Sequence, residues 1–185
     1  MALKDESIIH TAWSVKKYDQ AFSCLIEANA SDFYRTALRI VLDHEAAKDV
    51  LQEASIKMWQ GLPRFKAQSR FSTWATRIVI NESLSHLRRQ KQHVDVNSVV
   101  LSVPHSPYFE SDALIAALHE AVQQLPEKQR LTFQLRYFDE KPFAEIAELL
   151  GTSVGGLKAN YHHAAEKVKK HILALNPAYT DASND

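Results

Sequence analysis

Apolar residues recur every three or four positions through the first half of the chain, with polar residues between them. This spacing is typical of amphipathic helices. Residues 5–30 suit two short helices, and residues 32–42 predict a third. Asp43 is expected to cap a fourth helix, which Gly61 and the nearby Pro63 would end. The apolar stripe of this fourth helix consists of Ala47, Leu51, Ala54 and Met58.

A basic, polar loop separates that helix from the next, which is predicted to run from about residue 70 to residue 90 with Ser69 or Ser72 as its cap. The pattern breaks over residues 92–112, where two prolines and several serines indicate a linker. Helical periodicity returns over residues 113–175, and residues 176–185 are expected to be disordered. The sequence therefore predicts an all-α protein with two small helical domains, 1–91 and 113–175, joined by a flexible linker.

The second domain has the pattern of a helix-turn-helix. Pro126 and Pro142 each fit the start of a helix. Gly151 fits the position just after a helix end, where glycine tolerates a left-handed backbone. Thr152 or Ser153 would cap the third, longer helix. An ordinary three-helix bundle with a glycine corner remains the alternative for this segment.

In a helix-turn-helix the start of the last helix enters the major groove of DNA. Lys158 is suited to a phosphate or a guanine, and Asn160 to an adenine. Arg136, before the motif, is expected to hold a phosphate. The residues placed to meet DNA are Ser153, Gly155, Gly156, Lys158, Ala159, Asn160, His162 and His163.

Composition narrows the class of protein. Only four glycines and six prolines occur in 185 residues, which favours helices over a turn-rich β fold. The single cysteine, Cys24, excludes an internal disulfide and a cysteine-based zinc site. The chain has no apolar run near 18 residues and no signal-peptide pattern at its start, so the expected location is the cytoplasm.

Enzyme motifs are missing from the sequence: it has no glycine-rich phosphate loop, no G-x-S-x-G and no H-E-x-x-H. The nine histidines do not have ligand-like spacing. We therefore expect no catalysis, no small-molecule substrate, no cofactor and no metal site.

Charge is unevenly distributed although the net charge is zero. Residues 63–91 contain seven basic residues and one acid, Glu82, for a local charge of +6. Residues 92–118 contain three acids and no Lys or Arg. A local basic patch is typical of a surface that binds a polyanion. A solvated basic helix face is an equally good interpretation of the charge alone.

Two segments together resemble the bacterial sigma factor family, and more closely its two-domain extracytoplasmic-function (ECF) group. The first, which resembles region 2, is DHEAAKDVLQEASIKMWQGLPRFKAQSRFSTWATRIVINESLSHLRRQK. It is similar to the family's acidic helix, F-x-T-W-L-x-R-I-x-x-N and terminal L-R-R. The second, which resembles region 4, is LPEKQRLTFQLRYFDEKPFAEIAELLGTSVGGLKANYHHAAEKV. The resemblance implies a sigma factor that directs promoter-specific transcription initiation.

By this resemblance, region 2 would recognise the −10 element and hold its opened strand, using a basic groove, stacking surfaces and pockets for extruded bases. Thr73, Arg77, Asn81 and Arg88 share one approximate helix face. Phe71, Ala75 and Ile78 lie on another face, for which a core position stays open. For Trp74, both a core position and a stacking role stay open. The implied −10 residues are Lys66, Gln68, Ser69, Arg70, Phe71, Thr73, Trp74, Arg77, Asn81, Arg88 and Arg89.

The resemblance also implies the partners. Region 2 would bind the clamp helices of the polymerase β′ subunit, and region 4 the β flap and the −35 element. The linker would thread toward the active-site and RNA-exit channels of core RNA polymerase. An anti-sigma factor is expected to hold the protein inactive. The implied polymerase-binding residues are Asp49, Gln52, Glu53, Lys57 and Trp59.

The recognition helix departs from the family pattern, which is richer in arginine. Asn160 and His163 stand where arginine is common, and His162 is also unusual. Region 4 would then bind DNA weakly, read an atypical −35 sequence or respond to pH through its histidines. Two alternatives stay open: a stand-alone helix-turn-helix regulator, and a sigma mimic that binds an anti-sigma factor without binding promoters.

Overall fold

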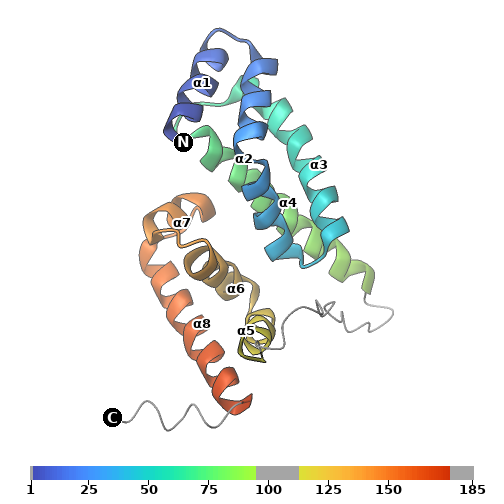
Figure 1. Cartoon of the computed structure of the whole chain (residues 1–185), viewed down its shortest axis with the longest axis vertical. Coiled ribbons are helices and arrows are strands. Elements are labelled where there is room, and N and C mark those ends of the chain that lie inside the picture. The colour runs from blue at the N-terminus through green and yellow to red at the C-terminus, as the bar shows by residue number, and fades with distance from the viewer. Residues whose placement is uncertain (1, 95–112, 176–185) are drawn as a thin grey trace. The chain divides into compact units, whose positions relative to one another are not determined.

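The computed structural model describes residues 2–94 and 113–175, and this part of the chain is helical with no strand (Figure 1). The chain divides into two compact units, residues 1–103 and 104–185. None of the described helices combines the length and hydropathy that a membrane-spanning segment needs. The tail expected over 176–185 and residues 95–112 of the expected linker lie outside the described residues. Residues 92–94, also expected to be linker, are helical instead.

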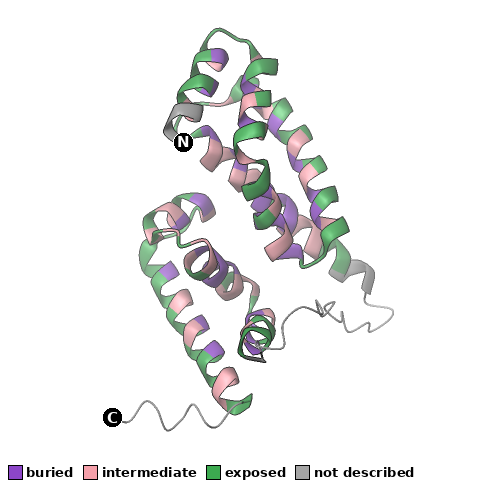
Figure 2. Ribbon diagram, in the orientation of Figure 1, coloured by how far each residue is buried: buried purple, intermediate pink, exposed green. Residues whose placement is uncertain are grey.

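Unit 1 is built from α1 (Ala2–Ser14), α2 (Tyr18–Val41), α3 (His44–Gly61), the 3-10 turn η1 (Leu62–Arg64) and α4 (Phe71–Val94). Each helix turns its apolar face inward, and the buried side chains meet in one core (Figure 2). The largest buried members of this core include Ile9, Leu25, Val50, Met58, Leu62 and Phe71.

The helix starts of unit 1 test the sequence predictions directly. Asp43 caps α3 as predicted, since its carboxylate accepts a hydrogen bond from the Ala46 N–H at 2.7 Å. The apolar stripe of α3 is buried at Ala47, Ala54 and Met58 as expected. Leu51 is only partly buried, and Val50, one position earlier, lies in the core instead.

The predicted division between the second and third helices is wrong, because residues 18–41 form one continuous helix, α2. Leu25 and Phe33 are both buried on its inner face. Asn29 lies between them, and its side-chain amide donates to the Leu25 carbonyl at 2.9 Å within the helix. With no glycine or proline there, packing of the long apolar face outweighs the weak local helix signal.

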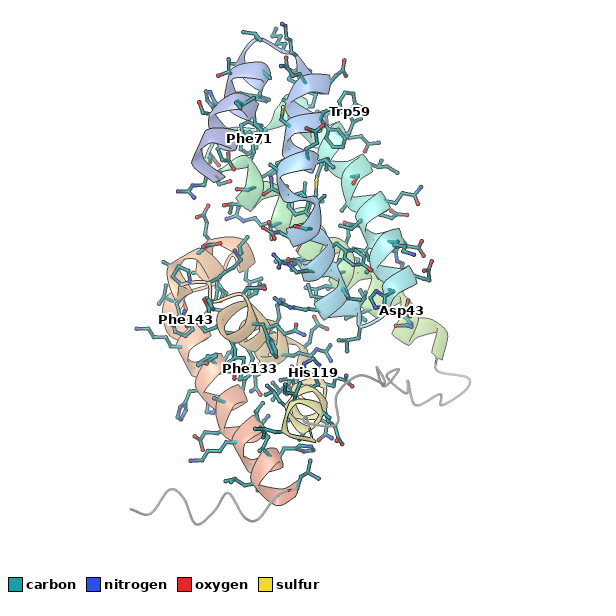
Figure 3. The ribbon with its side chains drawn as sticks, viewed as in Figure 1. Asp43, Trp59, Phe71, His119, Phe133 and Phe143 are labelled. Atoms are coloured by element: carbon teal, nitrogen blue, oxygen red, sulfur yellow. The ribbon has the colours of Figure 1, made fainter. Side chains whose placement is uncertain are left out.

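Unit 2 contains α5 (Ala113–Gln123), α6 (Glu127–Phe133), the π-helical turn η2 (Gln134–Phe138), α7 (Phe143–Leu150) and α8 (Val154–Leu175). Its core includes Phe133, whose ring stacks on Tyr161 at 5.7 Å (Figure 3). The π-helical turn was not predicted, because its apolar spacing does not differ visibly from that of an α-helix.

The turn between α7 and α8 is the predicted helix-turn-helix corner. Gly151 ends α7 with φ 61, the left-handed conformation expected of it. The Ser153 hydroxyl accepts a hydrogen bond from the Gly156 N–H at 3.1 Å, which identifies Ser153 as the cap of α8. Leu157, Ala164 and Val168 then fasten the inner face of α8 to its unit.

Candidate nucleic-acid and polymerase interfaces

The loop that joins α3 to α4 presents several polar side chains to solvent. Lys66, Gln68 and Arg70 are exposed, and Ser69 is half-buried. Ala67, in the middle of this group, has φ 52 and so turns the chain through the left-handed region. Two cations and an amide therefore stand on one short loop, a combination suited to a nucleic-acid strand.

Aromatic side chains pack together where this loop meets α4. The Phe65 ring lies 4.3 Å from the Phe71 ring and 5.2 Å from the Trp74 ring, measured between centroids. The edge of Trp13, from α1, meets Phe65 at 5.9 Å. Such tilted and edge-to-face pairs stabilise a cluster beyond the area that they bury, so the loop rests on a packed base.

The burial of the aromatics corrects one expected DNA contact. Phe71 is 2% exposed, so its side chain belongs to the core and not to a DNA-contacting surface (Figure 3). Trp74 is half-buried. A Cβ added at Gly61 would lie 2.9 Å from Trp74 Cζ2, so the indole ring fits tightly over that glycine. This close fit favours packing over base stacking for Trp74.

The outward face of α4 carries the remaining residues of the expected −10 set. Thr73 and Arg77 are half-buried, Asn81, Arg88 and Arg89 are exposed, and none of the five is buried. The Arg88 guanidinium donates to the Ser85 hydroxyl at 3.0 Å. The inward face is marked instead by buried Ala75, Val79 and Ile80. The helical period therefore separates the two faces as the sequence predicts.

A groove of about 300 Å³ lies between α3 and α4. The expected polymerase-binding residues Asp49, Gln52 and Glu53 line its α3 side and are exposed. The α4 side is lined by Glu82, His86 and Arg89. The groove thus joins part of the expected polymerase-binding set to one end of the expected DNA-binding set.

Lys57, another expected polymerase contact, is engaged within the molecule. Its ammonium lies 2.6 Å from the carboxylate of Glu82 on α4. The Glu82 side chain is only 8% exposed, whereas that of Lys57 is 51% exposed. A buried carboxylate needs a partner, so Lys57 has a structural role whether or not it also meets a protein.

Trp59 stands apart from the groove between α3 and α4. It is 42% exposed, and its ring meets the edge of Phe22 at 5.5 Å (Figure 3). A second, larger hollow of about 640 Å³ borders it, lined also by Lys16, Lys17 and Pro63. The structure therefore does not gather the five expected polymerase-binding residues at one place.

In unit 2 the expected −35 residues other than Arg136 gather at the start of α8. Of these eight, seven are exposed, namely Ser153, Gly155, Gly156, Lys158, Ala159, His162 and His163. Asn160 is half-buried. A Cβ added at Gly155 would meet no atom within 4 Å, so packing does not require glycine there. The small residues leave the backbone of this turn open to a close approach from outside.

The basic and titratable groups of this helix are few. Lys158 is the one Lys or Arg among residues 153–163. The rings of His162 and His163 lie 5.8 Å apart and are tilted by 55°. Within residues 2–94 and 113–175, no group of three or more His, Cys, Asp and Glu side chains is placed to hold a metal ion.

Arg136 has a structural task that the sequence did not indicate. Its Nη1 donates to the carbonyls of Glu140 at 3.4 Å and Lys141 at 3.1 Å, and its guanidinium lies 5.3 Å from the Phe143 ring centroid. These contacts brace the turn between η2 and α7. The expected phosphate contact of Arg136 would have to use its other nitrogens.

Arg130, in the same unit, is also occupied by the fold. Its Nη1 donates to the Gln123 carbonyl at 3.3 Å, near the end of α5. Partial burial lowers the pKa of Arg130, although a guanidinium stays charged at any physiological pH. Arg130 therefore joins α5 to α6.

Two α1 residues that bear on the loop were missed from the sequence. Glu6 accepts hydrogen bonds from the start of α4, and Trp13 donates one to the carbonyl of Leu62. Each contact joins residues at least 49 positions apart. No local pattern could have indicated them, because Glu and Trp are ordinary residues of an amphipathic helix.

Comparison with known proteins identifies both units. The model of Sigma-70 region 2 matches residues 25–93, and that of Sigma-70 region 4 matches residues 115–168. The ECF RNA polymerase sigma factor SigW of Bacillus subtilis is 27% identical over 176 residues, covering 87% of this chain and 94% of SigW. The RNA polymerase sigma-H factor of Pseudomonas aeruginosa is 29% identical over 179 residues, covering 88% of this chain and 90% of sigma-H.

Solved structures share the fold. The sigma factor RpoE in complex with the anti-sigma factor NepR, from Bartonella quintana, matches with a TM-score of 0.66 at 20% identity, covering 87% of this chain and 99% of RpoE. CnrH in complex with the cytosolic domain of CnrY matches with a TM-score of 0.65 at 19% identity, covering 97% of this chain and 99% of CnrH. Both likenesses extend over the two units.

Proposed function

Because this chain belongs to the ECF group of sigma factors, we propose that it binds core RNA polymerase and directs it to start transcription at specific promoters. The observation that carries the proposal is that the chain contains region 2 followed by region 4. In region 2 the basic residues near α4 are exposed, and in region 4 the start of α8 is exposed. The chain acts by binding, and the polymerase does the chemistry. Its place of action is the cytoplasm, where the polymerase works.

The −10 element is read by the loop before α4 and by the outward face of that helix. Lys66, Gln68 and Arg70 are exposed on the loop and would border an extruded base. Asn81 is exposed further along α4 and would contact the opened strand. The paired arginines that follow carry the charge that suits phosphates. Ser69, Thr73 and Arg77, all half-buried, complete this proposed surface.

The −35 element is read by the start of α8. Ser153 and the two glycines bring the main chain close to DNA, while Lys158 and Asn160 supply a cation and an amide. With one Lys in this stretch, duplex binding by region 4 alone would be weak. Simultaneous binding by region 2 within the polymerase complex compensates, since two linked contacts raise the effective concentration of each.

Core polymerase binds unit 1 along α3. Asp49, Gln52 and Glu53 offer exposed acidic and amide groups beside the groove, and Trp59 offers an exposed aromatic on another part of the helix. Such a surface suits a basic helix with apolar side chains. The β′ clamp helices are the proposed partner there, and the β flap is the proposed partner of region 4.

Regulation by an anti-sigma factor is part of the same proposal. The solved structures with this fold include the sigma factor RpoE bound to the anti-sigma factor NepR, and CnrH bound to the cytosolic domain of CnrY. The same architecture in this chain supports a comparable partner. The proposed domains are residues 1–91 and 113–175, with 92–112 as the connector that leaves the polymerase channel as RNA grows.

In vitro transcription from a library of randomised promoters tests the proposal, with core polymerase alone as the reference. We expect transcripts that share −10 and −35 sequences only when the protein is present. Lys66→Ala and Asn81→Ala should then lower the yield from the selected promoters. Arg35→Ala is the matched control, since it removes an exposed charge from α2 whose salt bridge is to Asp32, an exposed residue of the same helix.

The sparse charge of the recognition helix favours one second candidate, a sigma mimic that occupies an anti-sigma factor without binding promoters. Binding to core polymerase with no promoter-dependent transcript would support the mimic. A stand-alone regulator would bind a palindromic site without polymerase. Absence of both core binding and transcripts would refute the sigma function.

A further inference from the structure

Helix α1 precedes the segment that the region 2 model matches, which begins at residue 25. We propose that α1 sets the geometry of the −10 reading loop, with Glu6 as its main positioning residue. This inference rests on the proposed −10 function of that loop. It assigns a task to a helix outside the matched region.

Glu6, a residue of α1, caps the N-terminus of α4. Its Oε2 accepts from the Phe71 N–H at 3.1 Å, and its Oε1 accepts from the Ser72 N–H at 2.8 Å and the Ser72 hydroxyl at 2.5 Å. The first N–H groups of a helix have no partner within it. Neither predicted cap does this, because the Ser69 hydroxyl is directed to the Arg70 carbonyl and Ser72 lies inside the helix.

The charge of Glu6 suits this position. A carboxylate at a helix N-terminus is stabilised by the helix dipole and by charge-assisted hydrogen bonds. The same N–H groups would otherwise attract a DNA phosphate. Because Glu6 occupies them, the start of α4 is reserved for an internal contact, and phosphates are left to the exposed arginines.

Trp13 holds the other end of the loop. Its indole Nε1 donates to the Leu62 carbonyl at 2.9 Å, where α3 passes into the 3-10 turn. Its ring also meets Phe65 and Phe71 edge-on at 5.9 and 5.8 Å. One helix therefore holds the chain where the loop leaves α3 and where it enters α4.

The exposed reading side chains lie between these two held points. Lys66, Gln68 and Arg70 belong to the eight residues that lie between Leu62 and Phe71, both of which are buried. A short loop with fixed ends has few conformations. Loss of the Glu6 cap frees the first turn of α4 and lets the loop sample others, which weakens capture of unpaired bases.

The test compares Glu6→Ala and Glu6→Gln with wild type in holoenzyme, using a single-stranded −10 oligonucleotide selected by the promoter library. We expect the dissociation constant to rise about five- to ten-fold for Glu6→Ala and less for Glu6→Gln, whose amide oxygen still accepts a hydrogen bond. Core polymerase affinity should stay within about two-fold. Glu27→Ala, an exposed acid on α2, is the matched control.

Amide hydrogen exchange on the free full-length protein supplies a readout that does not depend on DNA. The Phe71 and Ser72 amides should exchange faster in Glu6→Ala and remain protected in the control. Trp13→Phe, which keeps a ring but loses the bond to Leu62, tests the second anchor if Glu6→Ala proves poorly folded. It should weaken oligonucleotide binding as well.

Oligonucleotide affinity within two-fold of wild type in a Glu6→Ala protein with faster Phe71 exchange would overturn the positioning role. A loss of oligonucleotide affinity that merely follows a loss of core binding would also overturn it. If wild-type holoenzyme binds no −10 strand at all, the proposed function itself fails. These results are distinguishable, because the wild-type measurement comes first.

Discussion

Replacing Lys57 by methionine should destabilise unit 1 more than replacing its partner Glu82 by glutamine. Methionine keeps most of the apolar stem of lysine but leaves the Glu82 carboxylate, which is 8% exposed, without its 2.6 Å partner. Glutamine at position 82 instead leaves the Lys57 ammonium without a carboxylate partner, but Lys57 is 51% exposed and water can hydrate its charge. The two single changes therefore remove the same ion pair at unequal cost.

The expected size follows from these exposures. Leaving one partner of a fully buried ion pair alone costs about 3–5 kcal/mol, and losing an exposed pair costs about 0–1 kcal/mol. Since one partner here is buried and the other half-exposed, we expect about 2 kcal/mol for Lys57→Met and about 1 kcal/mol for Glu82→Gln. The double variant should show a coupling energy of about 1 kcal/mol.

Urea unfolding followed by tryptophan fluorescence measures this directly. Trp13, Trp59 and Trp74 are the three tryptophans of the chain and all lie in unit 1, so the signal reports that unit alone. Midpoints should shift without a change in the denaturant slope. Equal losses for the two single variants, or a coupling energy below about 0.3 kcal/mol, would refute the argument from unequal burial.

Three further sets of substitutions test other parts of the structure. Ser153→Ala removes the cap of α8 and should cost about 1 kcal/mol of unit 2 stability, measured by thermal unfolding followed by circular dichroism. Gly155→Ala should raise the melting temperature more than Gly156→Ala. A Cβ added at Gly156 would lie 3.2 Å from the Ser153 hydroxyl oxygen, whereas one added at Gly155 would meet no atom within 4 Å. A larger increase for Gly156→Ala would contradict this reasoning. Arg88→Ala and Arg89→Ala should each reduce the salt slope of holoenzyme–promoter affinity by about 1, whereas an unchanged slope would remove these arginines from the phosphate contacts.

Several local features of the fold followed from the sequence. The Asp43 cap, the left-handed Gly151 and the Ser153 cap all lie where side-chain type and spacing place them. The exposed loop cations and the open start of α8 were also anticipated. Each of these rests on contacts within about four residues, which a sequence pattern records.

Other features were wrong or missed for a shared reason. The break expected inside α2 does not exist, and Val50 is more buried than Leu51. The sequence leaves both a core and a DNA-contacting position open for Phe71, and the structure places it in the core. Helical periodicity locates the centre of the buried face only to within about one residue. The packing of the neighbouring helices decides which residues are most buried. The same uncertainty leaves the role of Trp74 open in the sequence. In the structure the indole ring packs against Gly61 and Phe65, which favours a packing role.

The amino-acid sequence by itself determined the all-helical class, the order of the two sigma regions and the residues that cap the turn of the DNA-binding motif. Those properties depend on local periodicity and on motifs. The tertiary structure alone decided that Glu6 caps α4 from 65 residues away, that Lys57 is held by Glu82 and that Arg136 braces a turn. The physical reason is that a buried or helix-terminal polar group takes whichever partner packing brings near, and sequence separation does not limit that choice.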